Sequence, residues 1–455
     1  MKTIDLNHII LKWRVMTCAL VLLCCTNPAG ADEPLRLQNA DRRLSLLTCG
    51  PGDAIYTLFG HTAIRYRQPS QGVDVVFNYG MFDFSAPNFV LRFALGETDY
   101  QLGVTDFDRF MREYAFYGRS VVEQELNLSD EQAERLISQL EENYRPGNRV
   151  YRYNFFYDNC ATRPRDQIER AIGTLPADPA QTPFRLRYAD DLTTATDSTY
   201  RDLLHRYTEG HPWARFGIDL CMGREADRPI NRRQMMFVPF YVERYFSQAQ
   251  IEAVKQPASL AVTDTEVQTV TDTATQAVAQ TVAPRPLVAT SYKLLPQGES
   301  NKRNLWDTLT PDICAWTLLI LVVAASFLGF RTNHMLWGLD IALFTVAGVA
   351  GCIIAFLMTL SQHPCVGSNF MILLLHPLHL LCLPCMIRKL IKGRKSLYMI
   401  ANIVILTCFM TFWTLGYQDI PSAALPLALC LYTRSISNLL IVRKRQASDA
   451  SSDKQ

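Results

Sequence analysis

Residues 151–163 read YRYNFFYDNCATR, an aromatic run that ends in an asparagine and a cysteine. The aromatic residues favour a strand that continues up to Cys160. Residues 162–172 have a helical composition, and Gly173 is the residue type that commonly follows the end of a helix. The sequence therefore predicts that Cys160 lies where a strand passes into a helix.

This predicted position favours a reactive thiol. The first N–H groups of a helix and the positive end of its dipole stabilise a thiolate. We expect Arg163 and Arg165 to lower the pKa of the Cys160 thiol further. Pro164 cannot donate to the carbonyl of Cys160, so we expect the first helical turn to be kinked or to begin later.

The composition divides the chain into two unlike parts. Of its 455 residues 49% are hydrophobic, and residues 313–442 are mostly apolar, which excludes a purely cytosolic enzyme. The 45 basic residues nearly balance the 43 acidic ones, and the net charge is +2. This balance argues against nucleic acid as a partner, because nucleic-acid-binding domains carry a basic surplus.

The N-terminus has the layout of a secretory signal peptide. Arg14 precedes an apolar run over residues 15–25, and the small residues 29–31 form a cleavage site. A short signal anchor that stays in place is the alternative. We therefore expect residues 1–31 to be a signal peptide and residues 32–256 to form an exported domain.

A thiol nucleophile needs a histidine that takes and returns a proton during acyl transfer. The exported domain offers His61, His205 and His211. Residues 51–66 predict a turn followed by a strand that His61 begins, directly after Gly60. Further strands are predicted over 73–77 and 119–126, and a capping box, residues 129–132, predicts the start of a helix.

The C-terminal part predicts five membrane-spanning helices, each about 18–23 residues long and therefore able to cross a bilayer. They cover residues 313–330, 341–360, 369–387, 398–416 and 420–442. Basic residues gather in segments 388–395 and 443–445, which indicates that these segments are cytoplasmic. We expect residues 257–312 to be a linker and 443–455 a cytoplasmic tail. The exported domain then lies on the opposite side of the membrane.

Several other polar residues allow two interpretations. Cys49 and Cys221 either form a disulfide or remain two buried thiols. Arg434, within the fifth span, either extends to the cytoplasmic face or pairs with Asp340. His363, in an outer loop, either seats a phospholipid head group or caps the loop before a proline.

No metal site is expected. His376 and His379 lie three residues apart in the third span, but no carboxylate accompanies them there. Polar packing between helices is the simpler role for this pair.

Three motifs resemble those of the Lnb-type lipoprotein N-acyltransferases. They are residues 58–63 (LFGHTA), 78–80 (NYG) and 159–163 (NCATR). In the membrane half, His363 with its following proline, Asn369 and Pro377 extend the resemblance. That family joins an exported domain to a C-terminal membrane domain. The order of histidine before cysteine is similar to that of the circularly permuted papain-like superfamily, which includes lecithin retinol acyltransferase. The resemblance implies an α+β fold of this type, followed by an all-α domain of five transmembrane helices.

The resemblance implies an inner-membrane protein that works through an acyl-enzyme without a cofactor. The Cys160 thiolate attacks a phospholipid ester with His61 as general base and acid, and a diacylated lipoprotein takes the acyl chain on its N-terminal amine. Asn78 orients His61, with Asp83 as the second choice. Backbone N–H groups of Cys160 and Ala161 hold the oxyanion. The residues expected to bind substrate are Tyr56, Asn159, Arg163, His363 and Asn369.

Other functions use the same residue types. A cell-wall cysteine peptidase or amidase would use the same cysteine and histidine, and a phospholipase would differ only in using water as acceptor. A non-catalytic membrane-anchored sensor is a further alternative. Release of lysophospholipid together with an acylated amine distinguishes the acyltransferase from all three.

The charge pattern makes a prediction about topology. A reporter fused after Gln455 should be active only in the cytoplasm, and a reporter inserted at Gln276 only outside it. Paired reporters that respond in opposite compartments, such as alkaline phosphatase and green fluorescent protein, measure this. Both fusions reporting from the same side would contradict the five-span arrangement.

Overall fold

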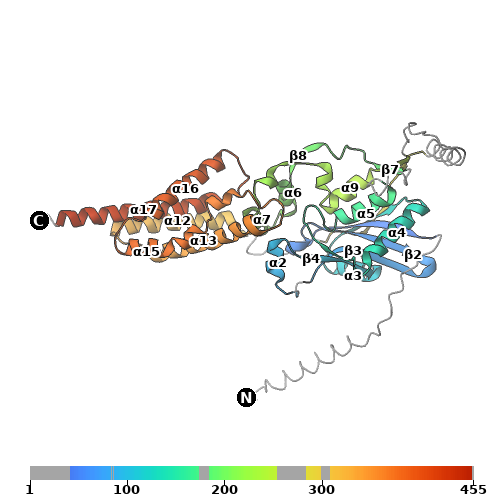
Figure 1. Ribbon diagram of the computed structural model, residues 1–455, viewed down its shortest axis with the longest axis horizontal. Coiled ribbons are helices and arrows are strands. Elements are labelled where there is room, and N and C mark those ends of the chain that lie inside the picture. The colour runs from blue at the N-terminus through green and yellow to red at the C-terminus, as the bar shows by residue number, and fades with distance from the viewer. Residues whose placement is uncertain are drawn as a thin grey trace, which may run out of the picture. The chain divides into compact units, whose positions relative to one another are not determined.

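The computed structural model describes residues 41–83, 85, 87–173, 184–253, 283–298 and 308–452. They form an N-terminal domain of mixed sheet and helix, followed by a bundle of apolar helices (Figure 1). The predicted signal peptide, residues 1–31, lies outside the described residues, and so does the segment 254–282.

The N-terminal domain is built on a seven-stranded sheet whose paired strands are all antiparallel. Its order is β12 (Val288–Leu295), β5 (Val121–Leu126), β1 (Arg43–Cys49), β2 (His61–Gln68), β3 (Val73–Met81), β4 (Asp99–Asp106) and β6 (Val150–Arg152). Two small sheets accompany it. One is β11 (Arg285–Pro286), β10 (Gln250–Ala253) and β7 (Phe184–Arg187), and the other is β8 (Ala195–Thr199) and β9 (Pro229–Asn231).

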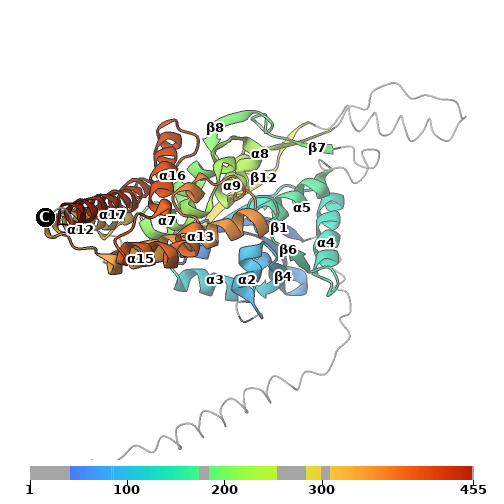
Figure 2. The ribbon, with the colours of Figure 1, turned by 60° about the vertical axis from the view of Figure 1, so that its left-hand side comes forward.

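Helices cover both faces of the large sheet (Figure 1 and Figure 2). On one face α3 (Phe107–Phe116) packs Phe110 and Tyr114 against alternate strand residues such as Leu47 and Ala63. On the other face lie α4 (Asp130–Tyr144), α5 (Thr162–Ile172) and α9 (Pro239–Ser247). Because paired strand residues share a face, the pairing of Cys49 with His61 directs His61 to the α3 side.

Local sequence signals account for the helix boundaries. The predicted capping box is confirmed: Ser129 accepts from the backbone N–H of Gln132, whose side chain accepts from the backbone of Ser129. Gly173 ends α5 in the left-handed conformation, as predicted. The expected delay at Pro164 is wrong, because α5 begins at Thr162 and its first turn needs no N–H from that proline.

The aromatic run before Cys160 is not one strand. Only residues up to Arg152 join the sheet, as β6, and the chain from Tyr153 to Ala161 turns repeatedly. These aromatic rings pack against one another in the turns. Phe156, for example, contacts Tyr200 and Phe237. The aromatic residues of this run thus pack in a hydrophobic cluster, and the strand that they predicted beyond Arg152 does not form.

The prediction that residues 257–312 form a linker is wrong for part of this segment, which contains two strands. Arg285–Pro286 pairs with β10, and Val288–Leu295 pairs with β5 as the edge strand of the large sheet. Most side chains of Val288–Leu295 are exposed. An edge strand of this kind needs few large apolar residues, which is why its composition resembled that of a linker.

The membrane domain contains helices long and apolar enough to cross a bilayer. Four straight ones are α12 (Pro311–Thr332), α13 (Trp337–Leu360), α16 (Leu397–Thr414) and α17 (Ala424–Ser452). A bent pair, Phe370–Leu381 and Leu383–Ile391, accounts for a fifth crossing if counted as one span. The pair includes the 3-10 turn η4 (Phe370–Leu373), α14 (Leu378–Leu381) and α15 (Leu383–Ile391).

The third span, predicted over residues 369–387, is thus not one continuous helix. The segment bends by 67°, and prolines at 377 and 384 stand at the starts of α14 and α15, where their missing N–H groups interrupt a continuous helix. Glycines of α13 let the bent segment approach closely. A Cβ at Gly351 would lie 2.5 Å from backbone atoms of His376.

The ends of these helices alternate between two sides. Residues just before α12, after α13 and after α16 all bond to the N-terminal domain, through Leu309, Gln362 and Gln418. At the other end Lys444 and Arg445 donate to the carbonyls of Phe330 and Asn333, at the C-terminal end of α12. The outer loops and the cytoplasmic ends expected from the basic residues thus gather on opposite sides.

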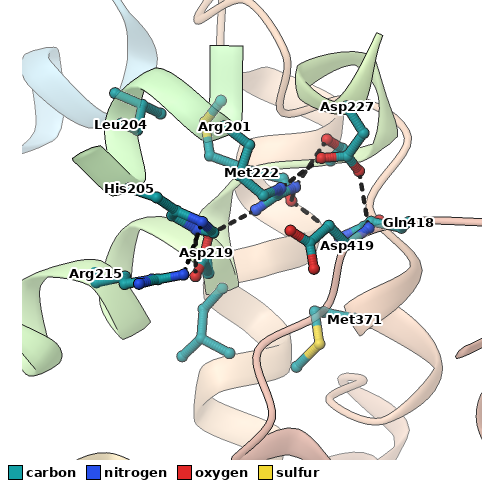
Figure 3. A network of polar contacts seen from close by, with 12 residues as sticks. Arg201, Leu204, His205, Arg215, Asp219, Met222, Asp227, Met371, Gln418 and Asp419 are labelled. Carbon is teal, nitrogen blue, oxygen red and sulfur yellow. Dashed lines mark hydrogen bonds and ion pairs between the residues drawn. The ribbon is translucent and has the colours of Figure 1, made fainter. Parts of the chain in front are cut away.

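A buried guanidinium anchors the part of the N-terminal domain that meets the membrane loops (Figure 3). Arg201 of α6 (Tyr200–Tyr207) is 1% exposed and pairs with Asp219 of α7 (Pro212–Cys221) at 2.8 Å. It also pairs with Asp227 at 2.5 Å. Asp227 in turn accepts from the backbone N–H of Asp419 in the loop between α16 and α17.

Two amides complete this junction. Asn369, 2% exposed, donates to the carbonyl of Leu220 at 2.8 Å and accepts from the N–H of Met371 at 3.0 Å. Gln418 donates to the carbonyl of Met222 at 3.1 Å and to Asn369 at 3.2 Å. The C-terminal end of α7 is therefore held by two loops of the membrane domain.

Within the bundle, Arg434 of α17 pairs with Asp340 of α13 at 2.7 Å, and both side chains are fully buried. The pairing interpretation of Arg434 is thus confirmed, and extension to the membrane surface is excluded. Ser326 and Asn438 bond to the same guanidinium. The polar group is therefore paired on several sides, as an apolar surrounding requires.

Removing one partner of this pair should destabilise the bundle. Asp340→Asn leaves the Arg434 guanidinium buried without its counter-charge, so the free energy of unfolding should fall by about 3–5 kcal/mol. Equilibrium unfolding of the full chain in detergent micelles measures this. Asp312→Asn is the matched control, because Asp312 bonds to Ser422 at an exposed position and its replacement should cost about 1 kcal/mol or less. An equal loss of unfolding free energy in the two variants would contradict a stabilising role of the buried Asp340–Arg434 pair.

Candidate active site

Cys160 lies in the turn between β6 and α5, and the amide of Asn159 organises that turn. The Asn159 Oδ1 atom accepts from the backbone N–H groups of Ala161 and Thr162 at 2.8 and 2.9 Å. Its Nδ2 donates to the carbonyl of Phe237 at 2.8 Å, and the residue is 3% exposed. Asn159 therefore positions Cys160 and has no free polar group for a substrate.

The turn brings Cys160 against the edge of the large sheet. The sulfur lies within hydrogen-bonding range of the backbone N–H of Thr62, the residue after His61. A Cβ at Gly80 would lie 3.2 Å from the Cβ of Cys160, and Gly80 has a φ of 89°. Only glycine meets both the backbone conformation and the close approach at this position.

His61 and Asn78 meet on neighbouring strands of the same sheet. The His61 Nε2 atom lies 3.3 Å from the Asn78 Oδ1 atom, so the ring presents its N–H to the amide oxygen when Nε2 is protonated. Asn78 is 8% exposed. Asp83, the second choice for this position, is exposed and accepts from the N–H and hydroxyl of Ser85 instead.

Both ionisable groups are neutral near neutral pH. Burial and the nearby Arg119 guanidinium lower the pKa of His61 to about 4, against the hydrogen bond with Asn78, which raises it. Burial raises the pKa of the Cys160 thiol to about 11, although the N–H of Thr62 and Arg119 act in the opposite direction. The expected thiolate is therefore wrong, because desolvation outweighs the favourable donors.

The two arginines expected to activate the thiol are engaged elsewhere. Arg163 forms a two-pronged pair with Asp158, with distances of 2.6 and 2.7 Å, and its guanidinium stacks 3.5 Å above the Tyr151 ring. Arg165 pairs with Asp166 at 2.7 Å. Each positive charge is thus balanced by a neighbouring carboxylate.

Arg119 is the arginine that acts on the site, and sequence reasoning missed it. It contributes to the pKa of both His61 and Cys160. Its Nε donates to the carbonyl of Gly50 at 2.9 Å, and its Nη2 is buried with no hydrogen-bond partner among the described residues. The only sequence signal was its place at the start of a predicted strand, which gives no hint of the contact with Gly50.

The oxyanion site expected from two backbone N–H groups needs a correction. The Ala161 N–H is already bonded to the Asn159 side chain at 2.8 Å. The N–H groups of Cys160 and Thr62 both act on the sulfur instead. These two backbone donors therefore lie nearest to the atom that would carry the acyl group.

The remaining candidates divide into two groups. Tyr56 is 60% exposed and its ring lies 5.9 Å from Phe82, at the sheet end that holds the site. His363 is bonded through Nε2 to the carbonyl of Phe93 at 2.6 Å, and Asn369 belongs to the junction with α7. His363 and Asn369 thus connect the membrane loops to the N-terminal domain.

The other histidines of the domain and Cys221 lie outside this cluster, whereas Cys49 pairs with His61 across the sheet. His205 bonds to Asp219 and Arg215 in the network around Arg201 (Figure 3), and His211 stands directly before α7. Cys49 and Cys221 are both free thiols, which removes the disulfide interpretation. Burial raises the pKa of Cys49 to about 12. No group of three or more metal-ligating side chains occurs among the described residues.

Comparisons with known proteins match the two parts of the chain separately. Residues 35–195 match the model of the Lnb N-terminal periplasmic domain, and residues 302–446 match that of the Lnb transmembrane domain. Searches of curated proteins and of solved structures each returned no match. The first match contains Cys160, His61 and Asn78, and the second contains the membrane helices.

The neutral state of the dyad predicts how Cys160 reacts with pH. The rate of its alkylation by iodoacetamide should rise about tenfold per pH unit between pH 7 and 9, because the thiolate fraction grows tenfold per unit below the pKa. Peptide mass spectrometry at residue 160 of the full chain measures the rate. The Cys160→Ser variant gives the background from other thiols. A rate that is constant over this range would instead indicate a preformed ion pair with His61.

Proposed function

The chain belongs to the Lnb family, since it carries the periplasmic and the transmembrane domain in order, and on that premise we propose that it is a lipoprotein N-acyltransferase. The enzyme takes an acyl chain from a membrane phospholipid and transfers it to the N-terminal amine of a diacylated lipoprotein. The observation that carries the proposal is the convergence of Cys160, His61 and Asn78 at one end of the sheet.

We assign the N-terminal domain to the circularly permuted papain-like type. An antiparallel sheet begins one strand with the histidine and holds the asparagine on the next, and the cysteine follows later, directly before a helix. This order of elements supports the assignment.

The first half-reaction begins from the neutral pair. His61, which remains unprotonated above a pH of about 4, takes the thiol proton as the Cys160 sulfur attacks the ester carbonyl. The N–H groups of Cys160 and Thr62 stabilise the oxyanion. The carbon–oxygen bond then breaks, and His61 returns the proton to the departing lysophospholipid. A thioester remains on Cys160.

In the second half-reaction the lipoprotein amine attacks the thioester carbonyl. His61 takes a proton from the attacking nitrogen, the carbon–sulfur bond breaks, and the sulfur leaves as a thiol after receiving that proton. The products are an amide-linked acyl chain on the lipoprotein and the free enzyme. Asn78 keeps the His61 ring oriented in both steps by holding Nε2.

Attachment to the membrane suits these substrates. Both the acyl donor and the lipoprotein acceptor lie in the outer face of the inner membrane, so a domain fixed to membrane helices meets them at a high effective concentration. Loops of the membrane domain bond to the N-terminal domain through Asn369 and Gln418. This supports a site held at constant height above the bilayer, on the periplasmic side.

The decisive prediction concerns the nucleophile. With phospholipid alone the wild-type enzyme should accumulate a hydroxylamine-sensitive acyl group on Cys160, and Cys160→Ser should lower transfer at least about a hundredfold, because a serine hydroxyl is a much weaker acid than a thiol and gives up its proton to His61 far less readily. Intact-mass analysis and mass spectrometry of lipoprotein N-termini measure the two effects.

Two other cysteines supply matched controls. Cys49→Ser and Cys221→Ser should retain transfer activity while lowering stability at most. Cys221 ends α7, outside the cluster. Cys49 pairs with His61 across the sheet, but its thiol is buried and burial raises its pKa to about 12. Full transfer by a folded Cys160→Ser protein would refute the covalent mechanism. Release of free fatty acid without an acylated amine would identify a phospholipase instead.

A further inference from the structure

An exposed apolar helix is connected to the candidate site by a row of aromatic rings and is bound to the end of a membrane helix. This helix, α2 (Phe89–Leu95), reads FVLRFAL and has no buried residue. Val90 is 80% exposed, Leu91 is 53% exposed and Phe93 is 47% exposed. A continuous apolar surface of this kind is unusual on a domain surrounded by water and marks a contact with another apolar phase.

Hydrogen bonds fix the position of α2 relative to the membrane. The helix α13 ends at Leu360, and two residues later the Gln362 N–H donates to the carbonyl of Leu95 at 2.8 Å. The His363 Nε2 donates to the carbonyl of Phe93 at 2.6 Å. Three residues of chain span at most about 10 Å, so α2 lies next to the point where α13 leaves the bilayer.

A row of aromatic rings connects α2 to Cys160. It consists of Phe93, Phe89, Phe82, Tyr100 and Tyr153, and we call it the aromatic row. Successive ring centroids along it are 6.2, 5.9, 5.0 and 4.1 Å apart.

The two ends of the aromatic row differ in exposure. Phe93 is 47% exposed at the membrane end, whereas Tyr100 is 7% exposed near the site. Tyr153 lies beside Gly80 together with Cys160, since a Cβ at Gly80 would be 3.8 Å from the Tyr153 ring. The row therefore runs from the exposed surface of α2 to the nucleophile.

We propose that α2 inserts its apolar side chains into the outer leaflet of the bilayer that α13 spans, and that the aromatic row is the path along which a phospholipid acyl chain reaches Cys160. The occupant is phospholipid because the bond between α2 and the end of a membrane span brings its exposed side chains to the bilayer surface. The path rests on the proposed acyltransferase function, whereas the lipid contact of α2 does not.

Charge at α2 agrees with this location. The helix contains no acidic residue, and its single basic residue, Arg92, donates to Asp99 at 2.7 Å and to the carbonyl of Glu97 at 3.0 Å. The Arg92 guanidinium is thus bonded to the residues that follow α2 and is paired with a carboxylate. The apolar residues 90, 91 and 93 can then enter the bilayer without taking an unpaired charge with them.

The lipid contact is tested by photo-crosslinking in the full chain. Benzoylphenylalanine replaces Val90 or, as control, Tyr144 at the exposed end of α4, and the protein is placed in nanodiscs of phosphatidylethanolamine and phosphatidylglycerol. We expect at least about tenfold more phospholipid adduct at position 90 than at 144, with or without an added Cys160→Ser change. Equal yields would overturn the membrane contact.

The path is tested by acyl-thioester formation from the same bilayers. Val90→Asp should slow it about tenfold, because the charge keeps α2 out of the leaflet, whereas Tyr144→Asp should leave it unchanged. Equal rates in Val90→Asp and wild-type protein, with adduct still formed at position 90, would overturn the path. If the wild-type protein forms no thioester while the variant with benzoylphenylalanine at position 90 still forms the phospholipid adduct, the lipid contact is supported and the proposed function is overturned.

Discussion

The buried guanidinium of Arg201 is the interaction on which the arrangement of the two domains depends. It holds the carboxylates of Asp219 and Asp227 and donates to the carbonyls of two residues that follow α7. The adjoining backbone then bonds to the membrane loops, where the Gly223 N–H donates to the carbonyl of Cys365. A charge that is 1% exposed is stable only while its partners stay in place. The buried Arg201 guanidinium therefore holds the segment after α7 in place, and hydrogen bonds from that segment to the membrane loops hold the N-terminal domain against them.

Most ionisable groups at the candidate site are likewise either neutral or paired with an opposite charge. His61 and Cys160 are both neutral, and Arg163 is matched by Asp158. Within the described part of the chain, Arg119 alone brings an incompletely bonded positive group close to them. A neutral pair suits an apolar substrate, since an acyl chain arriving from the bilayer displaces no strongly hydrated ion from the sulfur. The cost is a weaker resting nucleophile, so the proton must move to His61 during the attack. The reactivity of Cys160 is thus governed by the orientation of one ring, which Asn78 fixes.

Much of this arrangement could be predicted from short sequence motifs. The Gly-His motif, the NYG motif and the later Asn-Cys motif grouped His61, Asn78 and Cys160, because together they resemble a family in which these residues act on one another. The predictions that were wrong concern properties that depend on how the folded chain surrounds a residue. The thiol pKa is decided by burial, and the Ala161 N–H is taken by an amide two residues earlier. Arg119 reaches the site only through the fold. The edge strand Val288–Leu295 was missed because exposed strands carry little hydrophobic pattern.

That edge strand also sets the order in which the protein can be completed during its synthesis. The β5 strand has β1 on one side and β12 on the other, and β12 is the last of the described strands to leave the ribosome before α12. Until it arrives, the backbone N–H and carbonyl groups of β5 remain unpaired along one edge and are open to association with other chains. The sheet therefore closes only when the first membrane helix is being made. A fragment that stops at residue 256 lacks this strand, so a cut at that point would leave the N-terminal domain with an incomplete sheet.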